Sequence, residues 1–349
     1  MHSSAGTEGL ATGESLKDMG RKLVENAWAM NTAKQDRIVM RLFSRFALAT
    51  KRVPRIVGAE VGTERFRQQD DMLVEFVAFM ASQGLNHTTC KTYLLSLGRQ
   101  FLTEEGYTQV AKHVRPMLAV SGLERLQGAR VTGPKDETPA LTSGALRQGI
   151  DTLESMYKVD EERRRMRAIL CIGVTFMMRI SEIIPSQGTQ HYVRWGGVRF
   201  EGGTDERPSS MVVTFPSSKK KKAPEAREIS ATWSKICAVR AVHEYKQGRE
   251  HERISPETSL FCGGGGMAMV KAVEIKEAIK AVASKSGLEG VDMFTTKSMR
   301  VGGVTSLIEQ SEVAGHVIEK FGRWNSDTWK KIYQRATKKT GEGLAKHLG

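Results

Sequence analysis

The chain has 349 residues and a formal net charge of +14, with 53 lysines and arginines against 39 acidic residues. This length allows two domains with separate hydrophobic cores, and the excess positive charge favours a polyanionic partner. An anionic membrane surface is the rival to nucleic acid. The sequence contains no basic amphipathic helix with a bulky aromatic face, so nucleic acid is preferred.

The four cysteines are widely separated and form no Cys-x-x-Cys pair. This spacing argues against a zinc ribbon and a disulfide framework, and is typical of a reducing compartment. The N-terminus lacks the apolar segment of a secretory signal. The longest apolar run, residues 168–178, is shorter than the roughly 18 residues that span a bilayer. We therefore expect a soluble, intracellular protein with no membrane partner.

Residues 1–15 are small, polar and Gly-rich, and are expected to be disordered. From residue 16 to residue 127, apolar residues recur with helical spacing and no strand pattern intervenes. A small helical bundle is predicted here. Its apolar stripes are Met40, Phe43, Phe46 and Ala47, then Leu73, Phe76, Val77 and Met80, then Tyr93, Leu94, Leu97 and Phe101.

Basic residues decorate this predicted bundle. Taken singly, each is best explained as part of a solvated helix surface. The residues in question are Lys91, Arg99, Lys112, His113 and Arg115.

Residues 128–140 are rich in Gly, Pro and charge and show no apolar period, so they are the best domain boundary in the chain. Residues 141–349 would form a second domain. It would open with a helix from Leu141 to Tyr157, and a second helix would start at Asp160. That second helix ends in a dense apolar run followed by Arg179. A buried arginine needs an ionic partner, and Glu182 is suitably placed. Without other evidence, an ordinary core ion pair is the better explanation of these two residues.

The one β region follows. Short strands are predicted at residues 198–200, 211–215 and 227–231. Between the last two strands lies a hairpin tip with four lysines, residues 219–222. This tip is either a solvated turn or a nuclear localisation signal. Further helices are expected at residues 233–245 and 270–284. The four glycines after Cys262 lack a following Gly-Lys-(Ser/Thr), so no nucleotide site is predicted.

The C-terminal stretch 295–336 concentrates residues that bind oxyanions. A helix is predicted to begin near Lys297, which places Arg300 in its first turn. A second short helix covers residues 316–321, ahead of Trp324. A helix-start signal at residues 325–327 predicts a third helix, which would carry Tyr333 nine residues after the tryptophan. This arrangement would bring cations, an indole N–H and a phenol around one oxyanion.

These motifs resemble the tyrosine recombinase and phage integrase family, in a Cre-like version similar to the recombinases of eukaryotic mobile elements. Lys297-Ser-Met-Arg300, then Gly-Arg-Trp324, then Tyr333 match the family pattern, except that Lys297 replaces the usual His. Arg179-Ile-Ser-Glu182 matches the first arginine box, 121 residues before Arg300.

The resemblance also covers the lysine hairpin. The family carries its catalytic lysine on this hairpin, and Ser218-Lys219 matches best, with Lys220 a close second. The implied fold is mainly α with a small β-sheet. It consists of an N-terminal helical core-binding (SAM-like) bundle, residues 16–127, and a mixed α+β catalytic domain, residues 141–349.

The resemblance implies a metal-free and ATP-free reaction on double-stranded DNA through a 3′-phosphotyrosine. It further implies a monomer that assembles into a homotetramer on DNA, in the nucleus if the host is eukaryotic. The implied roles are Tyr333 as nucleophile, Arg179 and Arg300 as phosphate ligands, Lys219 as general acid, Lys297 and Trp324 as donors to the phosphate, Glu182 as a supporting residue, and Lys91, Arg99, Arg115 and Lys220 as DNA contacts.

Two other functions remain open at this point. A type IB topoisomerase uses similar residues but relaxes supercoils as a monomer. A DNA-binding regulator with impaired catalysis would keep the fold without the reaction. Lys297 bears on both, because a lysine can donate to a phosphate as His⁺ does but shuttles protons less readily near neutral pH.

Overall fold

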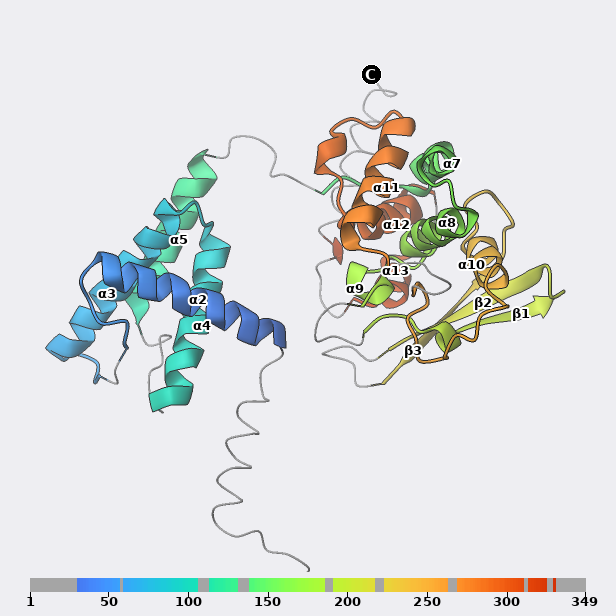
Figure 1. The fold of residues 1–349 in the computed structure, drawn as a ribbon. Helices are drawn as coiled ribbons and strands as arrows, with labels where there is room; N and C mark the ends of the chain where they lie inside the picture. Colours follow the sequence, from blue (N-terminus) through green and yellow to red (C-terminus); the bar gives the residue numbers. More distant parts are fainter. Residues whose placement is uncertain are drawn as a thin grey trace, which may run out of the picture. The chain divides into compact units, whose positions relative to one another are not determined.

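A computed structural model describes residues 30–56, 59–105, 113–130, 138–185, 191–216, 223–262, 269–310, 313–324 and 329–330. The chain divides into two compact units, Met1–Lys135 and Asp136–Gly349 (Figure 1). The division falls within the stretch 128–140 of the sequence, although the last helix of the first unit continues to Arg130. The segment expected to be disordered, residues 1–15, lies outside the described residues. In the ranges above, no helix combines the length and apolar character needed to cross a membrane.

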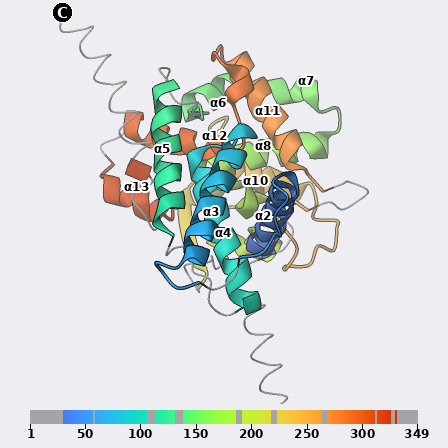
Figure 2. The same ribbon diagram turned by 90° about the vertical axis from the view of Figure 1, so that its left-hand side faces the viewer.

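The first unit is a helical bundle, as predicted. Its described helices are α2 (Met30–Ala49), α3 (Glu64–Ser82), α4 (His87–Glu105) and α5 (Val114–Arg130). Helix α2 packs against α4, and α3 packs against α5 (Figure 2). The predicted apolar stripes line the core, where Phe43 makes edge-on contacts with Phe76 and Phe101 at centroid distances of 5.1 and 6.0 Å.

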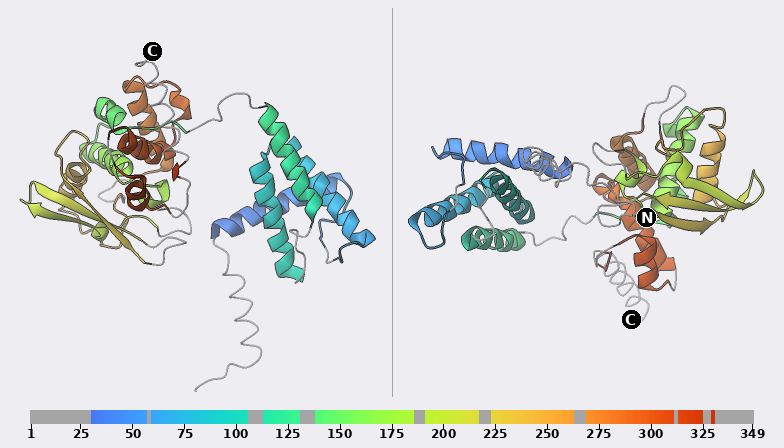
Figure 3. Two further views of the ribbon diagram at one scale, coloured as in Figure 1. Left: turned by 180° about the vertical axis from the view of Figure 1, so that it is seen from behind. Right: turned by 90° about the horizontal axis from the view of Figure 1, so that it is seen from below.

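The second unit combines helices with one small sheet. In Figures 1 and 3 the sheet lies at one edge of this unit, beside α8 and α10. The elements are α6 (Ser143–Gly149), α7 (Thr152–Met156), α8 (Asp160–Thr175), α9 (Ile180–Ile183), β1 (Val198–Gly203), β2 (Pro208–Phe215), β3 (Glu225–Ser230), α10 (Ala238–Gln247), α11 (Ala272–Lys285), α12 (Lys297–Gln310) and α13 (Gly315–Phe321), with 3₁₀ turns at Trp195–Gly197 and Val291–Met293.

The three predicted strands form an antiparallel sheet in the order β1-β2-β3. Met211 of the central strand β2 pairs with Phe200 of β1 and Ile229 of β3. Most of β2 is buried, whereas β3 alternates between half-buried and exposed residues, as an outer strand does. The hairpin tip between β2 and β3, with its four lysines, lies outside the described residues.

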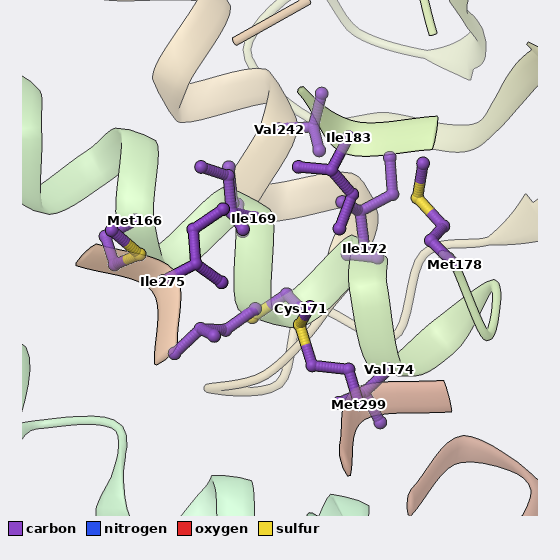
Figure 4. Close-up of a cluster of buried hydrophobic side chains, with 14 of the residues drawn as sticks. Met166, Ile169, Cys171, Ile172, Val174, Met178, Ile183, Val242, Ile275 and Met299 are labelled. Atoms are coloured by element: carbon purple, nitrogen blue, oxygen red, sulfur yellow. The ribbon is translucent and has the colours of Figure 1, made fainter. Parts of the chain in front are cut away.

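Helix α8 forms the centre of the second unit. Its residues from Ala168 to Val174 are all buried, and side chains from several elements converge on them (Figure 4). Met299 of α12 reaches Cys171 and Val174 in this view. The close approach requires Gly173, because a Cβ at this position would lie 2.6 Å from the Met299 Sδ. The core therefore fixes the start of α12 against the end of α8.

Two helix predictions were wrong in their boundaries. The helix expected over residues 141–157 is broken into α6 and α7. The helix expected from residue 233 begins only at Ala238, because Trp233 has a left-handed backbone (φ 51°) that a helix cannot contain. The helix expected over 270–284 is confirmed as α11, Ala272–Lys285.

The aromatic core of the first unit provides a test of its packing. We expect Phe76→Ala to lower the free energy of unfolding of this unit by about 3–5 kcal/mol, because Phe76 is fully buried and contacts two other phenylalanines. Leu48→Ala on α2 is the control. Leu48 is 81% exposed, so its removal should change stability by less than about 0.5 kcal/mol. Denaturant titration measures both, and equal losses would contradict the described packing.

Candidate functional site

Helix α12 presents Arg300 from its first turn, as predicted. Two glycines after it allow the helix to touch neighbouring backbone directly. A Cβ on Gly302 would lie 1.8 Å from the Leu141 carbonyl oxygen, and one on Gly303 would lie 2.2 Å from the Val174 carbonyl oxygen. Larger residues would push the helix away from α8. The Arg-Val-Gly-Gly sequence therefore sets the position of Arg300.

The Arg300 guanidinium connects three segments. It donates to the Met177 carbonyl oxygen after α8 and to the Gly322 carbonyl oxygen after α13, the latter at 2.9 Å. Its Cζ lies 3.8 Å from the ring centroid of Trp324, a cation–π contact. Burial, together with the charge of Arg179, lowers the pKa of Arg300 to about 9. The group remains a cation at neutral pH.

The Gly-Arg-Trp segment at residues 322–324 ends helix α13. The Trp324 ring folds back over Gly322, so that a Cβ on Gly322 would lie 1.4 Å from ring atom Cζ3. Trp324 is 8% exposed and packs with Met177, Ile318 and Trp329. A glycine is thus required before the arginine if the indole is to reach Arg300.

Arg179 and Glu182 form the predicted ion pair. Glu182 accepts from the Arg179 backbone N–H at 2.8 Å and from its guanidinium at 3.0 Å. The expectation that Arg179 is a buried arginine was wrong, because its side chain is 48% exposed. Helix α8 ends at Thr175, and a turn in which Met177 has φ 50° carries Arg179 out of the core.

The buried arginine of the site is Arg323, which the sequence reasoning did not assign. It is 7% exposed and donates to Glu182 Oε2 at 2.8 Å and to the Phe176 carbonyl oxygen at 3.0 Å. Its Cζ lies 3.7 Å from the ring centroid of Phe215 on β2. Apolar periodicity could not have identified Arg323, because this residue follows a helix end and pairs with a carboxylate 141 residues away in the chain.

Positive charge exceeds negative charge in this cluster. The three guanidiniums of Arg179, Arg300 and Arg323 surround the single carboxylate of Glu182. Burial raises the pKa of Glu182, but the charge of Arg323, the Arg179 N–H and the charges of Arg179 and Arg300 outweigh it and hold the pKa below its usual value. The partly exposed Arg179 opens the cluster to an anion, and planar guanidiniums suit phosphate oxygens.

Of the other predicted catalytic residues, only Lys297 lies in the described part of the chain. Lys297 is exposed in the first turn of α12, next to Arg300 in the helix. Lys219, Lys220 and Tyr333 lie outside the described residues. Strand β3, which follows the lysine hairpin, is tied to the end of α13 by a hydrogen bond from Arg227 to the Lys320 carbonyl oxygen at 3.0 Å.

Two residues close before Tyr333 in the chain, Trp329 and Lys330, are described. Trp329 is 6% exposed and belongs to the small apolar cluster with Trp324. A Cβ on Gly315 would lie 2.5 Å from its ring, so α13 approaches this indole closely. The chain four residues before Tyr333 is therefore packed beside the Gly-Arg-Trp segment.

The basic residues predicted on the surface of the first unit differ in their exposure and in their ion pairs. Lys91 is exposed on α4. Arg99 pairs with Asp36 at 2.9 Å, and Arg115 pairs with Asp71. The assignment of His113 to the bundle surface was wrong, because it is 4% exposed and its ring lies 3.1 Å from an oxygen of the buried Asp70.

Within the residues that the structure describes, no three His, Cys, Asp or Glu side chains gather as metal ligands would. The charged cluster at α9, α12 and α13 is built from arginines and one carboxylate. Its chemistry is that of an anion-binding site.

Comparisons with known proteins give a structural likeness. No family model and no curated protein matches the sequence. Among solved structures, the XerH site-specific recombinase bound to a palindromic difH substrate in a post-cleavage complex matches with a TM-score of 0.58 and 17% identity, over 86% of this chain and 75% of that one. The pre-cleavage complex of XerH with difH matches with a TM-score of 0.51 and 15% identity, over 84% and 72%. The chain has the tyrosine recombinase fold.

The contact between Gly322 and Trp324 yields a prediction. Gly322→Ala should destabilise the second unit by about 1–3 kcal/mol, because the added methyl group overlaps the Trp324 ring and displaces it from Arg300. Gly144→Ala in α6 is the matched control. Its nearest neighbour would be 3.8 Å away, so no loss is expected. Denaturant titration compares the two, and equal stabilities would show that the indole does not lie on Gly322.

Proposed function

We propose that this protein is a tyrosine-type site-specific DNA recombinase that cleaves and rejoins DNA through a 3′-phosphotyrosine intermediate, without metal or ATP. The observation that carries the proposal is the joining of Arg179 and Arg300 in one cationic, partly exposed site. Glu182 holds the first arginine, and Trp324 stacks on the second.

The proposed chemistry needs these charges. Attack of the Tyr333 oxygen on a DNA phosphodiester forms a bond to phosphorus, and the bond to the 5′ oxygen breaks. Negative charge grows on the nonbridging oxygens, where Arg179 and Arg300 donate hydrogen bonds. The phenol gives up its proton, and Lys219 protonates the leaving 5′ oxygen. The phosphodiester energy is kept in the covalent intermediate, so strand rejoining needs no ATP.

Lys297 and Trp324 complete the phosphate contacts in this proposal. Trp324 holds Arg300 through its ring and offers its indole N–H to a nonbridging oxygen. Lys297 adds a cation from the first turn of α12. It acts here as a hydrogen-bond donor to the phosphate.

The proposed partner is duplex DNA, bound by a monomer that assembles into a homotetramer. The XerH structures, which are complexes with the difH substrate, share the fold and support this partner. Lys91, Arg99, Arg115 and Lys220 are the proposed additional DNA contacts. Arg99 and Arg115 would exchange or share their carboxylate partners on binding. Since phosphate contacts release counterions, affinity should fall steeply with salt.

The nucleophile is tested with nicked suicide duplexes made from the DNA that flanks the gene. The wild-type protein should form a covalent adduct that resists denaturant. Tyr333→Phe should reduce adduct formation below detection, because it removes the attacking oxygen. An adduct that survives this substitution would refute the assignment of Tyr333.

The same assay separates the two alternative functions. Adducts with any duplex, together with plasmid relaxation by a monomer, would identify a type IB topoisomerase. Tight duplex binding with no adduct would identify a DNA-binding regulator.

The general acid is tested separately. Lys219→Ala should slow cleavage of an ordinary phosphodiester by about 10²–10⁴-fold, because the 5′ oxygen then leaves without a proton. A 5′-bridging phosphorothioate should restore the rate, since a thiolate leaves unprotonated. Lys220→Ala is the matched control, with an ordinary rate expected. Rescue of Lys220→Ala and not of Lys219→Ala would move the role to Lys220.

A further inference from the structure

Arg323 has no part in the chemistry proposed above, although it lies within the site. Its side chain is 6% exposed, and it is enclosed by Glu182, the Phe176 carbonyl oxygen and the Phe215 ring. A DNA phosphate could reach it only by breaking these contacts. Direct contact with the substrate is therefore excluded, and its role has to act through its neighbours.

The backbone of Arg323 is in the left-handed region, with φ 58°. This conformation costs a residue other than glycine about 1–2 kcal/mol. A glycine at position 323 would relieve that cost. The arginine side chain must then contribute enough through its own contacts to offset the strain.

Those contacts join four parts of the second unit. The guanidinium binds the turn after α8 through Phe176, helix α9 through Glu182 and strand β2 through Phe215. Its own backbone connects the end of α13 to Trp324. Two of the residues so fixed, Glu182 and Trp324, are the ones that touch Arg179 and Arg300.

We propose that Arg323 is a positioning residue that holds Arg179 and Arg300 in a preformed phosphate site. It does so by fixing Glu182 from behind and by setting the path of the chain into Trp324. This inference rests on the proposed function for the identity of the anion. The geometry on which it depends, a carboxylate shared by an exposed and a buried arginine, is independent of the chemical step.

Loss of Arg323 would raise the pKa of Glu182, an effect that a loss of packing alone would not have. The charged groups facing Glu182 are Arg179, Arg300 and Arg323, and Arg227 of β3 acts on Arg323 in turn. Burial alone raises the pKa of Glu182, and Arg323 is the foremost of the groups that lower it. Without Arg323 the carboxyl group would take up a proton at a higher pH, and a neutral Glu182 would no longer hold Arg179.

The test uses Arg323→Gly in the full-length protein, since glycine accepts the left-handed backbone and keeps the fold. On nicked suicide duplexes from the flanking DNA, cleavage at saturating DNA should slow by about 10- to 100-fold, because the phosphate ligands are misplaced. Duplex affinity should change little. The acid limb of the pH–rate profile should move to higher pH. Adding Glu182→Gln should abolish that movement, because no carboxyl group is left to titrate.

Two controls accompany the cleavage assay. Arg199→Ala removes a 67% exposed arginine of the sheet and should leave the profile unchanged. Thermal unfolding of Arg323→Gly checks that the fold is kept. An unchanged rate and acid limb in a folded Arg323→Gly protein would overturn the proposal, as would an acid limb that still moves in the double variant.

Calorimetric titration with orthovanadate tests the positioning role of Arg323 without requiring the covalent step. The wild-type protein should bind this phosphate analogue, and Arg323→Gly should weaken binding about tenfold at neutral pH, equivalent to about 1.4 kcal/mol. Equal affinities, or no binding to the wild-type protein, would refute a preformed site. A wild-type protein that binds orthovanadate more tightly than Arg323→Gly yet forms no adduct would instead refute the proposed recombinase activity alone.

Discussion

The carboxylate of Glu182 is the group on which the site depends. One of its oxygens accepts from the Arg179 guanidinium, and the other accepts from the Arg179 backbone and from Arg323. A single acid, whose side chain is 12% exposed, therefore orients an exposed arginine and neutralises part of a buried one. Removing one partner of a largely buried pair such as Glu182–Arg323 typically costs about 3–5 kcal/mol, so these two residues constrain each other. Helix α9, only four residues long, takes its position from these contacts.

The arginines repel one another, and this repulsion prepares the site for an anion. Arg300 lies close enough to Arg179 and Arg323 for their charges to contribute to the lowering of its pKa to about 9, after burial itself. Two carbonyl oxygens and the Trp324 ring hold it in place without neutralising it. A phosphate bound between Arg179 and Arg300 would supply the missing negative charge. Preorganised cations of this kind stabilise charge that develops during phosphoryl transfer without further reorganisation.

Local patterns predicted most helices and strands of the fold and the Arg179–Glu182 ion pair. Apolar periodicity identified the helices that form both cores, and the four-residue box at 179–182 predicted the Arg179–Glu182 pair, because such signals lie within one or two turns of chain. The burial of Arg323 and the exposure of Arg179 were not predictable. Both depend on turns with positive φ and on a contact that spans 141 residues, which no local pattern contains.

A structure of the Tyr333→Phe protein on intact duplex DNA tests the central claim most directly. One phosphate should lie within hydrogen-bond distance of both Arg179 and Arg300, with Trp324 still stacked on Arg300 and Glu182 still shared by Arg179 and Arg323. A complex in which the DNA backbone contacts other parts of the second unit, and this cluster stays free of phosphate, would contradict the account.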